Sequence, residues 1–191
     1  MTRLSRTLAV TIGLAVGGWV TSCAPPLTTQ VVAVPASARE AQLERQVLDQ
    51  VVSYRGTRGR AALRRNPALD QMARQHSEFL RTNRGKFQVH GPNVSHYGIE
   101  QRAFAARQFL GMSQLGENVA AASQQGASTA SYLVGLWAKS PAHEFNMCNS
   151  WTNTGVGVVI DSDGTVFATQ VFASQSLPTS HLSMLNSLKV H

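Results

Sequence analysis

The sequence predicts an α+β domain with a layered helix–sheet–helix arrangement that ends in a C-terminal β-hairpin. Two observations predict this class. Apolar residues recur at helical spacing in several segments between residues 38 and 148. Residues 156–172 are instead rich in β-branched and aromatic residues, which is typical of strands. Helices that come first and a hairpin that comes last indicate layers packed around one core.

The first 22 residues have the pattern of a secretory signal. Arg3 and Arg6 precede an apolar run over residues 7–20 that is too short for a membrane-spanning helix, which needs roughly twenty apolar residues. The run ends in Val20-Thr21-Ser22-Cys23, which resembles the bacterial lipobox, a signal whose cysteine is acylated and becomes the first residue of the mature protein. An ordinary signal peptide with an incidental Cys23 is the alternative.

A lipid anchor at Cys23 would hold the mature chain on a membrane, because each buried methylene contributes about 0.8 kcal/mol and several chains make the anchor stable. Ala24 in the next position resembles an outer-membrane address, facing the periplasm, if the cell is Gram-negative. Cys148 then has no partner in the mature chain, so no disulfide framework is available. We predict four segments: a lipoprotein signal peptide over 1–22, a Pro/Thr/Ser tether over 23–37, a domain over 38–174 and a tail over 175–191.

The positive charge of the mature chain is concentrated before residue 108. Residues 39–107 hold thirteen Lys and Arg against six Asp and Glu, whereas the residues after them hold two against four. A basic face attracts anionic partners such as an envelope polymer or a lipid headgroup, although a solvated surface explains the same pattern. We expect no binding of nucleic acid, because the chain is secreted and has no nucleic-acid motif, and we expect a monomer.

Five segments are predicted as helices. The first begins at Ser37 and Glu40, which match a capping box, and it runs to residue 55. The second begins at Asn66-Pro67, a cap followed by proline at the first helical position. Its apolar face includes His76, for which we predict a buried, hydrogen-bonded position that serves packing. The other three are GIEQRAFAARQFL (98–110), ASTASYLVGLWAK (127–139) with Tyr132, Leu133, Leu136 and Trp137 on one face, and SPAHEFNMC (140–148).

The end of the domain changes to a strand pattern. VGVVI and TVFATQVF are predicted strands, and DSDG between them is a good hairpin turn. The glycines of TGVGVV favour close packing on the sheet. No element is assigned to residues 111–126, where LGENVAAAS places the carboxylate of Glu117 among small residues. A lone carboxylate is costly to bury, so a cation, a histidine or a metal should meet Glu117, unless it is solvated.

Three segments hold a histidine or a glutamate near the predicted element boundaries: SHYGIEQR, GENVA and WAKSPAHEFN. The order A..HS, SH, GENVA, W..SP.H..N, GVGV and TQ.F resembles the bacterial branch of the CAP superfamily, also called the SCP-like extracellular domain. The resemblance covers residues 43–173. It implies a three-layer α-β-α sandwich of CAP/SCP type, with a central cleft that is lined by histidine and glutamate and holds a divalent cation in some members.

The resemblance also implies site residues. Glu117 matches the glutamate of GEN, and His143 matches the histidine of SP.H. His96, which lies 21 residues before Glu117, is the preferred second histidine, and His90 is the alternative. Two imidazoles and one carboxylate match a zinc site with an open position. The resemblance therefore implies a metal site of His96, Glu117 and His143, with zinc as the first candidate.

Two departures from the family pattern reduce the implied set of ligands. Ser140 stands where many members carry an acid, three residues after the tryptophan. Phe167 and Ala168 stand where eukaryotic members often have a histidine before the TQ pair. The complete eukaryotic tetrad is therefore absent from this sequence.

The motifs favour binding over catalysis. The sequence has no His-Glu-x-x-His zinc helix and no Gly-x-Ser-x-Gly nucleophile elbow. We expect an envelope-anchored binding module whose cleft holds a divalent metal. The alternatives are a metal-dependent hydrolase of envelope peptides or lipids, with Glu117 as base and His143 as ligand or acid, and a structural lipoprotein. In the structural case Glu117 accepts only backbone N–H bonds and His143 is a surface residue.

Overall fold

A computed structural model describes residues 33–84, 96–123 and 126–175, all in the second of the two units into which the chain divides, 32–191. The elements are α1 (Ala38–Thr57), β1 (Arg64–Arg65), α2 (Pro67–Thr82), α3 (Ile99–Leu110), β2 (Met112–Ser123), the 3-10 helix η1 (Gly126–Ser128), α4 (Thr129–Ala138), α5 (Pro141–Cys148), β3 (Asn153–Ile160) and β4 (Thr165–Gln175). The predicted signal peptide, most of the tether and the tail lie outside the described residues.

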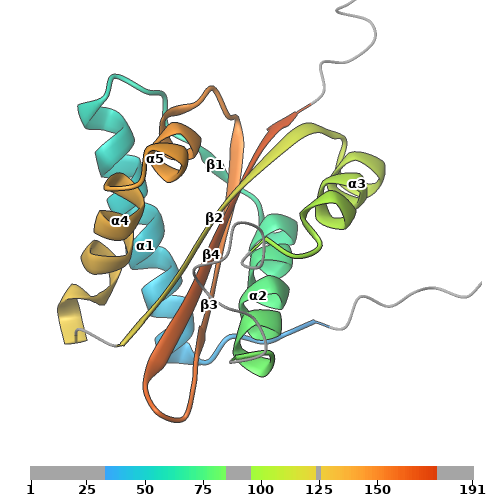
Figure 1. Cartoon of the computed structure of the whole chain (residues 1–191). Coiled ribbons are helices and arrows are strands. Elements are labelled where there is room, and N and C mark those ends of the chain that lie inside the picture. Colours follow the sequence, from blue (N-terminus) through green and yellow to red (C-terminus); the bar gives the residue numbers. More distant parts are fainter. Residues whose placement is uncertain (1–32, 85–95, 124–125, 176–191) are drawn as a thin grey trace, which may run out of the picture. The chain divides into compact units, whose positions relative to one another are not determined.

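One mixed sheet forms the middle layer, with strand order β1-β3-β4-β2. Helices α1, α4 and α5 lie on one side of it and α2 and α3 on the other (Figure 1). Strands β3 and β4 are the predicted hairpin, and both β2 and β3 pair antiparallel with β4. The predicted α+β class and the α-β-α layering are confirmed.

The local helix signals act as the sequence predicted, with one exception on α4. Ser37 and Glu40 form the capping box of α1, and the Asn66 side chain caps α2 ahead of Pro67. On α4, the predicted apolar face is correct for Leu133 and Trp137, which are buried, but the Tyr132 side chain is exposed. The buried stripe includes Ala130 and Val134 instead, so the helix is rotated relative to the predicted face.

Strand β2 is the element that the sequence analysis does not assign. It pairs with β4 along nearly its whole length, from Met112 opposite Gln175 to Ser123 opposite Thr165. Its C-terminal half contains three consecutive alanines at 120–122, and alanine has low strand propensity. Pairing with the apolar strand β4 overrides that propensity, and it places Glu117 in the interior of an edge strand.

Each face of the sheet has its own apolar core. The larger core lies under α1, α4 and α5 and includes Val47, Leu133, Trp137 and Phe172, and the smaller one lies under α2 and α3. Gly155 and Gly157 of β3 let α2 approach the strand closely, because a Cβ on either would overlap the α2 backbone. The predicted close packing at TGVGVV is confirmed.

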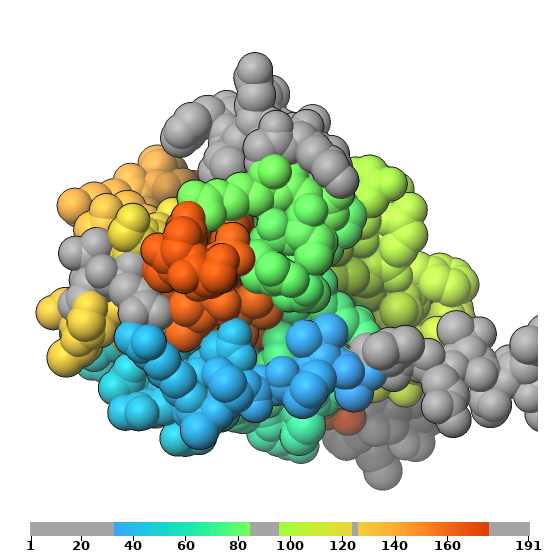
Figure 2. Space-filling view, turned by 90° about the horizontal axis from the view of Figure 1, so that it is seen from below, coloured from blue at the N-terminus to red at the C-terminus, as the bar shows by residue number. Residues whose placement is uncertain are grey.

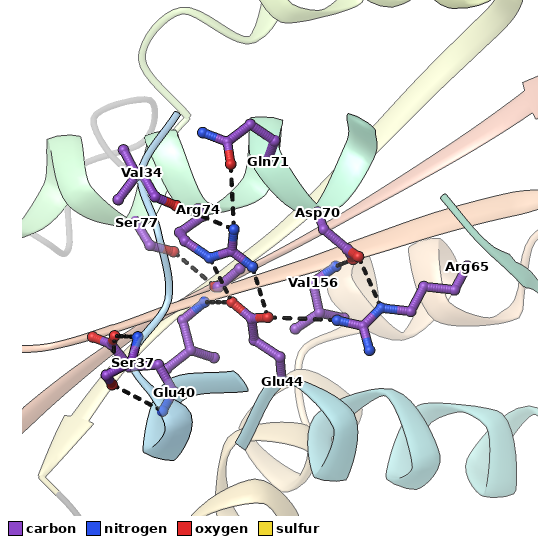
Figure 3. A network of polar contacts seen from close by, with 12 residues as sticks. Val34, Ser37, Glu40, Glu44, Arg65, Asp70, Gln71, Arg74, Ser77 and Val156 are labelled. Atoms are coloured by element: carbon purple, nitrogen blue, oxygen red, sulfur yellow. Dashed lines mark hydrogen bonds and ion pairs between the residues drawn. The ribbon is translucent and has the colours of Figure 1, made fainter. Parts of the chain in front are cut away.

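The outer edge of β3 is closed by carboxylates rather than by another strand. Beyond its short pairing with β1, three of its backbone N–H groups donate to acidic side chains: Val156 to Asp70, Val158 to Glu44 and Ile160 to Glu40. Arg65 binds Asp70 and Glu44, and Arg74 binds Glu44 (Figure 3). An unpaired edge is a site for pairing with another chain, so this network both satisfies the donors and blocks the edge.

The turn of the β3–β4 hairpin is tied to α2. Asp161 lies within ion-pair distance of Arg81 and Arg84, and Asp163 pairs with Arg84. Figure 2 looks at this end of the molecule and shows the hairpin (orange) between α1 (blue) and α2 (green). Among the described residues, no helix is long and apolar enough to cross a membrane.

Candidate functional site

Glu117 is the charged centre of the site. It lies on β2 opposite Val171 of β4, and its side chain is 1% exposed. Its side chain meets α2 and α3, which contribute His76 and Arg102. A buried carboxylate needs both a counter-charge and hydrogen bonds, and Glu117 has both.

Arg102 supplies the counter-charge. Its Nε donates to Oε2 of Glu117 at 2.8 Å and its Nη2 donates to Oε1 at 2.7 Å, which is the two-pronged geometry that makes arginine–carboxylate pairs strong. Its Nη1 donates to the carbonyl of Tyr97 at 2.9 Å. Gly98 starts α3 in the left-handed conformation (φ 78°), and a Cβ there would lie 3.3 Å from Nη1. The glycine therefore leaves room for the guanidinium.

Histidines surround the other side of the carboxylate. Nδ1 of His96 lies 2.9 Å from Oε1 of Glu117, and Nε2 of His76 lies 3.6 Å from the same oxygen. His143 enters from α5, and its ring centroid lies 6.4 Å from that of His96. We call Glu117, Arg102, His76, His96 and His143 the Glu117 cluster.

Two asparagines fix α5 against β2 and so place His143. Nδ2 of Asn118 donates to the carbonyl of His143 at 3.0 Å, and Nδ2 of Asn146 donates to the Glu117 carbonyl and to Oδ1 of Asn118, each at 3.0 Å. The side chain of Asn118, on β2, thus binds the backbone of α5. A Cβ on Gly116 would lie 2.8 Å from the ring of Trp151, so the glycine of GEN allows this close packing.

The electrostatics of the cluster keep Glu117 ionised. Burial by itself raises the pKa of Glu117, but the hydrogen bond from His96 and the interactions with His76 and Arg102 outweigh it, and the pKa lies below its usual value. Burial lowers the pKa of His143, and the nearby His96 lowers it further. At neutral pH the cluster therefore holds a carboxylate, a guanidinium and a neutral His143.

A pocket of about 400 Å³ lies beside the cluster, between α2 and the start of α3. We call it the α2–α3 pocket; it is lined by Met72, Gln75, His76, Phe79, Tyr97, Gly98, Gln101 and Arg102. The rings of Phe79 and Tyr97 stack at 5.2 Å between centroids. The pocket thus joins an aromatic wall to the histidine and the arginine that hold Glu117.

The predicted metal ligands come together, but their arrangement does not fit a metal ion. His96 contacts Glu117, and His143 lies across from His96. The alternative ligand His90 lies outside the described residues, as does the predicted lipidation site, Cys23. Both oxygens of Glu117 are already bound by Arg102. Within the described ranges there is no group of three or more His, Cys, Asp or Glu side chains arranged to hold a metal. The predicted zinc site stays a prediction, and in this arrangement a guanidinium occupies the place of a cation at Glu117.

The sequence did not predict the role of Arg102, and it predicted only the burial of His76. His76 is buried, as predicted, yet its Nε2 faces Glu117 in addition to packing within α2. The available signal for Arg102 was the need of a buried carboxylate for a cation, together with an arginine on the helix that follows the SH segment. No pattern in the sequence distinguished Arg102 from Arg107 on the same helix.

The sequence and the fold both match known proteins. Residues 48–172 match the model of the CAP family, described as the cysteine-rich secretory protein family. Comparison with curated proteins gives no match. Among solved structures, an outer surface protein from Borrelia burgdorferi superposes with a TM-score of 0.59 at 12% identity, covering 75% of this chain and 99% of that one.

Two further solved structures have the same fold. An extracellular protein containing an SCP domain from Bacillus anthracis has a TM-score of 0.54 at 23% identity, covering 75% of this chain and 45% of that one. A cysteine-rich secretory protein from Staphylococcus aureus has a TM-score of 0.53 at 16% identity, covering 73% and 41%. This chain thus spans less than half the length of these two proteins, and the similarity concerns the fold.

Proposed function

This chain belongs to the CAP family of cysteine-rich secretory proteins, and on that basis we propose that it is an extracellular binding module anchored to the cell envelope. The observation that carries the proposal is the Glu117 cluster beside the α2–α3 pocket. The cluster concentrates buried polar groups that packing alone does not require. The adjacent pocket offers apolar and polar walls of the kind that bind small ligands or polymer segments.

Binding is favoured over catalysis by the partners of Glu117. Its side chain contacts His76, His96 and Arg102, and none of these residues is a serine or cysteine nucleophile. Both carboxylate oxygens are engaged in hydrogen bonds, so Glu117 is poised to hold neighbouring groups in place rather than to accept a proton. The ligand we propose is an anionic envelope polymer or lipid, for which the net positive charge of the chain adds long-range attraction.

Anchoring is the part of the proposal that rests on the sequence alone. The apolar run followed by Val20-Thr21-Ser22-Cys23 supports acylation of Cys23. The tether over residues 23–37 then separates the lipid from the start of α1 at Ala38. Such a chain places its binding site near the membrane surface and within reach of envelope material.

A hydrolase is the second candidate, and one contact favours it. The 2.9 Å approach of Glu117 to Nδ1 of His96 fixes which nitrogen of the ring faces the carboxylate. An imidazole oriented in this way serves as a general base in many enzymes. A metal-dependent form, as the sequence analysis anticipated, requires Glu117 to release Arg102 first.

The test compares binding and turnover in the same preparations. Purified protein is incubated with isolated peptidoglycan and, separately, with vesicles of anionic phospholipid; Glu117→Gln and His143→Ala remove cluster groups, and Glu78→Gln removes a carboxylate of α2 outside the cluster. We expect the cluster variants to weaken binding by about tenfold or more, equivalent to roughly 1.4 kcal/mol, and the control to bind normally. Product that accumulates with zinc and disappears with chelator would establish the hydrolase. Equal binding by all variants would exclude the cluster as the site.

A further inference from the structure

We infer that Arg102 takes the place of a divalent cation in this site, so that the Glu117 cluster is complete without metal. The inference goes beyond the proposed function, because it concerns how the site is held together rather than what it binds. Its basis is the two-pronged pair in which Arg102 binds both oxygens of a carboxylate that is 1% exposed.

The guanidinium of Arg102 is held by the carboxylate of Glu117 and by the backbone carbonyl of Tyr97. Arg102 lies in the first turn of α3, and its third nitrogen donates to the Tyr97 carbonyl just before the helix. Its side chain is 15% exposed, so it is largely enclosed. Gly98 gives Nη1 the space that a Cβ would restrict. These three hydrogen bonds fix the Arg102 side chain, so a metal ion could bind Glu117 only if some of them broke.

Charge balance leads to the same conclusion. Glu117 is the carboxylate that contacts Arg102 and the histidines of the cluster, and Ser140, at the start of α5, adds no acid. One carboxylate and one guanidinium already sum to zero. A divalent ion that entered beside Glu117 would stand close to the buried positive charge of Arg102, and repulsion between like charges in a poorly solvated site opposes its binding.

Removal of Arg102 would leave Glu117 facing only the histidines of the cluster. His76 and His96 each place a ring nitrogen within 3.6 Å of Oε1 of Glu117. Two imidazoles and a carboxylate are a donor set that zinc accepts. These donors lie beside the guanidinium, so we expect that loss of Arg102 would let zinc approach Glu117 and the two imidazoles.

The experiment is a zinc titration of the purified, chelator-treated protein at about pH 7.5, where unperturbed histidine is mostly neutral, followed by calorimetry and by thermal unfolding. Arg102→Met keeps the length of the side chain without its charge, and Arg107→Met is the matched control on an exposed position of α3. We expect no zinc-dependent rise in melting temperature for wild type and the control. Arg102→Met should bind zinc at least about tenfold more tightly, and added zinc should raise its melting temperature.

Two results would overturn the inference. One is stoichiometric zinc binding by wild type that Glu117→Gln abolishes. The other is an Arg102→Met variant that binds zinc no better than wild type. If Arg102→Met does not fold alone, refolding yields with and without zinc give the same comparison, and equal yields would also overturn it. These readouts report metal binding and unfolding, so they are independent of whether the proposed envelope ligand is correct.

Discussion

Replacing Glu44 with glutamine should destabilise the protein strongly, although the change alters a single charge outside the proposed site. Glu44 is 1% exposed and accepts two hydrogen bonds from Arg74, at 2.8 Å each, and one from the Val158 backbone at 3.2 Å. Glutamine keeps one acceptor oxygen, but its amide nitrogen would face the guanidinium. Figure 3 shows Arg74 bonded to both carboxylate oxygens of Glu44, and the variant would leave the guanidinium with weaker partners.

The magnitude follows from the burial of the pair. Removal of one member of a buried ion pair costs about 3–5 kcal/mol, and we expect the lower end, because Arg74 keeps its bonds to the Val34 carbonyl and to Gln71. About 3 kcal/mol corresponds to a fall in melting temperature of roughly 10 °C for a domain of this size. Asp49→Asn is the matched control. Asp49 is an exposed acid on the same helix, so its loss should cost below about 1 kcal/mol.

Urea unfolding measures both variants, with fluorescence of Trp137 and Trp151, which belong to the main core, as the signal. A loss of less than about 1 kcal/mol for Glu44→Gln, or equal losses for the two variants, would mean that the buried carboxylate network does not stabilise the β3 edge.

Three further predictions follow from other features. Gly157→Ala should destabilise by about 3 kcal/mol, because its Cβ would overlap the α2 backbone, whereas Gly135→Ala on α4, which has open space around it, should stabilise by about 0.5–1 kcal/mol in the same urea assay. The free energy of unfolding should fall as pH drops below 6.5, the ordinary pKa of His143, because the unfolded chain binds a proton there that folded His143 resists. It should fall again below 4.5, the ordinary pKa of Glu117, because the unfolded chain binds a proton before the folded carboxylate does. Melting temperatures measured across this range check both steps, and a flat profile would contradict them. Cys23→Ala should move the protein to the soluble envelope fraction or leave an uncleaved precursor on immunoblots, and unchanged processing and membrane recovery would argue against acylation.

Local signals predicted the helices and the hairpin well, because caps and turns depend on residues close in sequence. The capping box at Ser37, the Asn66-Pro67 start and the DSDG turn are each satisfied by neighbours within a few positions. Strand β2 was missed because its alanines carry little strand signal, and its identity depends on β4, about fifty residues later. The exposure of Tyr132 likewise depends on how α4 packs against the rest of the domain, which the apolar pattern of the helix does not determine.

The residues of the candidate site were likewise predicted only in part. The resemblance to the CAP superfamily brought Glu117, His96 and His143 together, and the structure places His96 against the carboxylate with His143 nearby. Arg102 could not be singled out, because it lies on a different element from Glu117 and no fixed sequence separation marks a contact between two elements. The role of His76 was predicted as packing alone for the same reason: an apolar helix face predicts burial but not the polar group at its end.

A double-mutant cycle measures whether Arg102, rather than a metal, holds Glu117. Unfolding free energies are measured for wild type, Glu117→Gln, Arg102→Met and the double variant, each with chelator present. We expect a coupling energy of about 2–3 kcal/mol between the two positions, because each single change leaves an enclosed charge without its partner and the double change removes both charges. Single effects that add to within about 0.5 kcal/mol would mean that Arg102 does not hold Glu117.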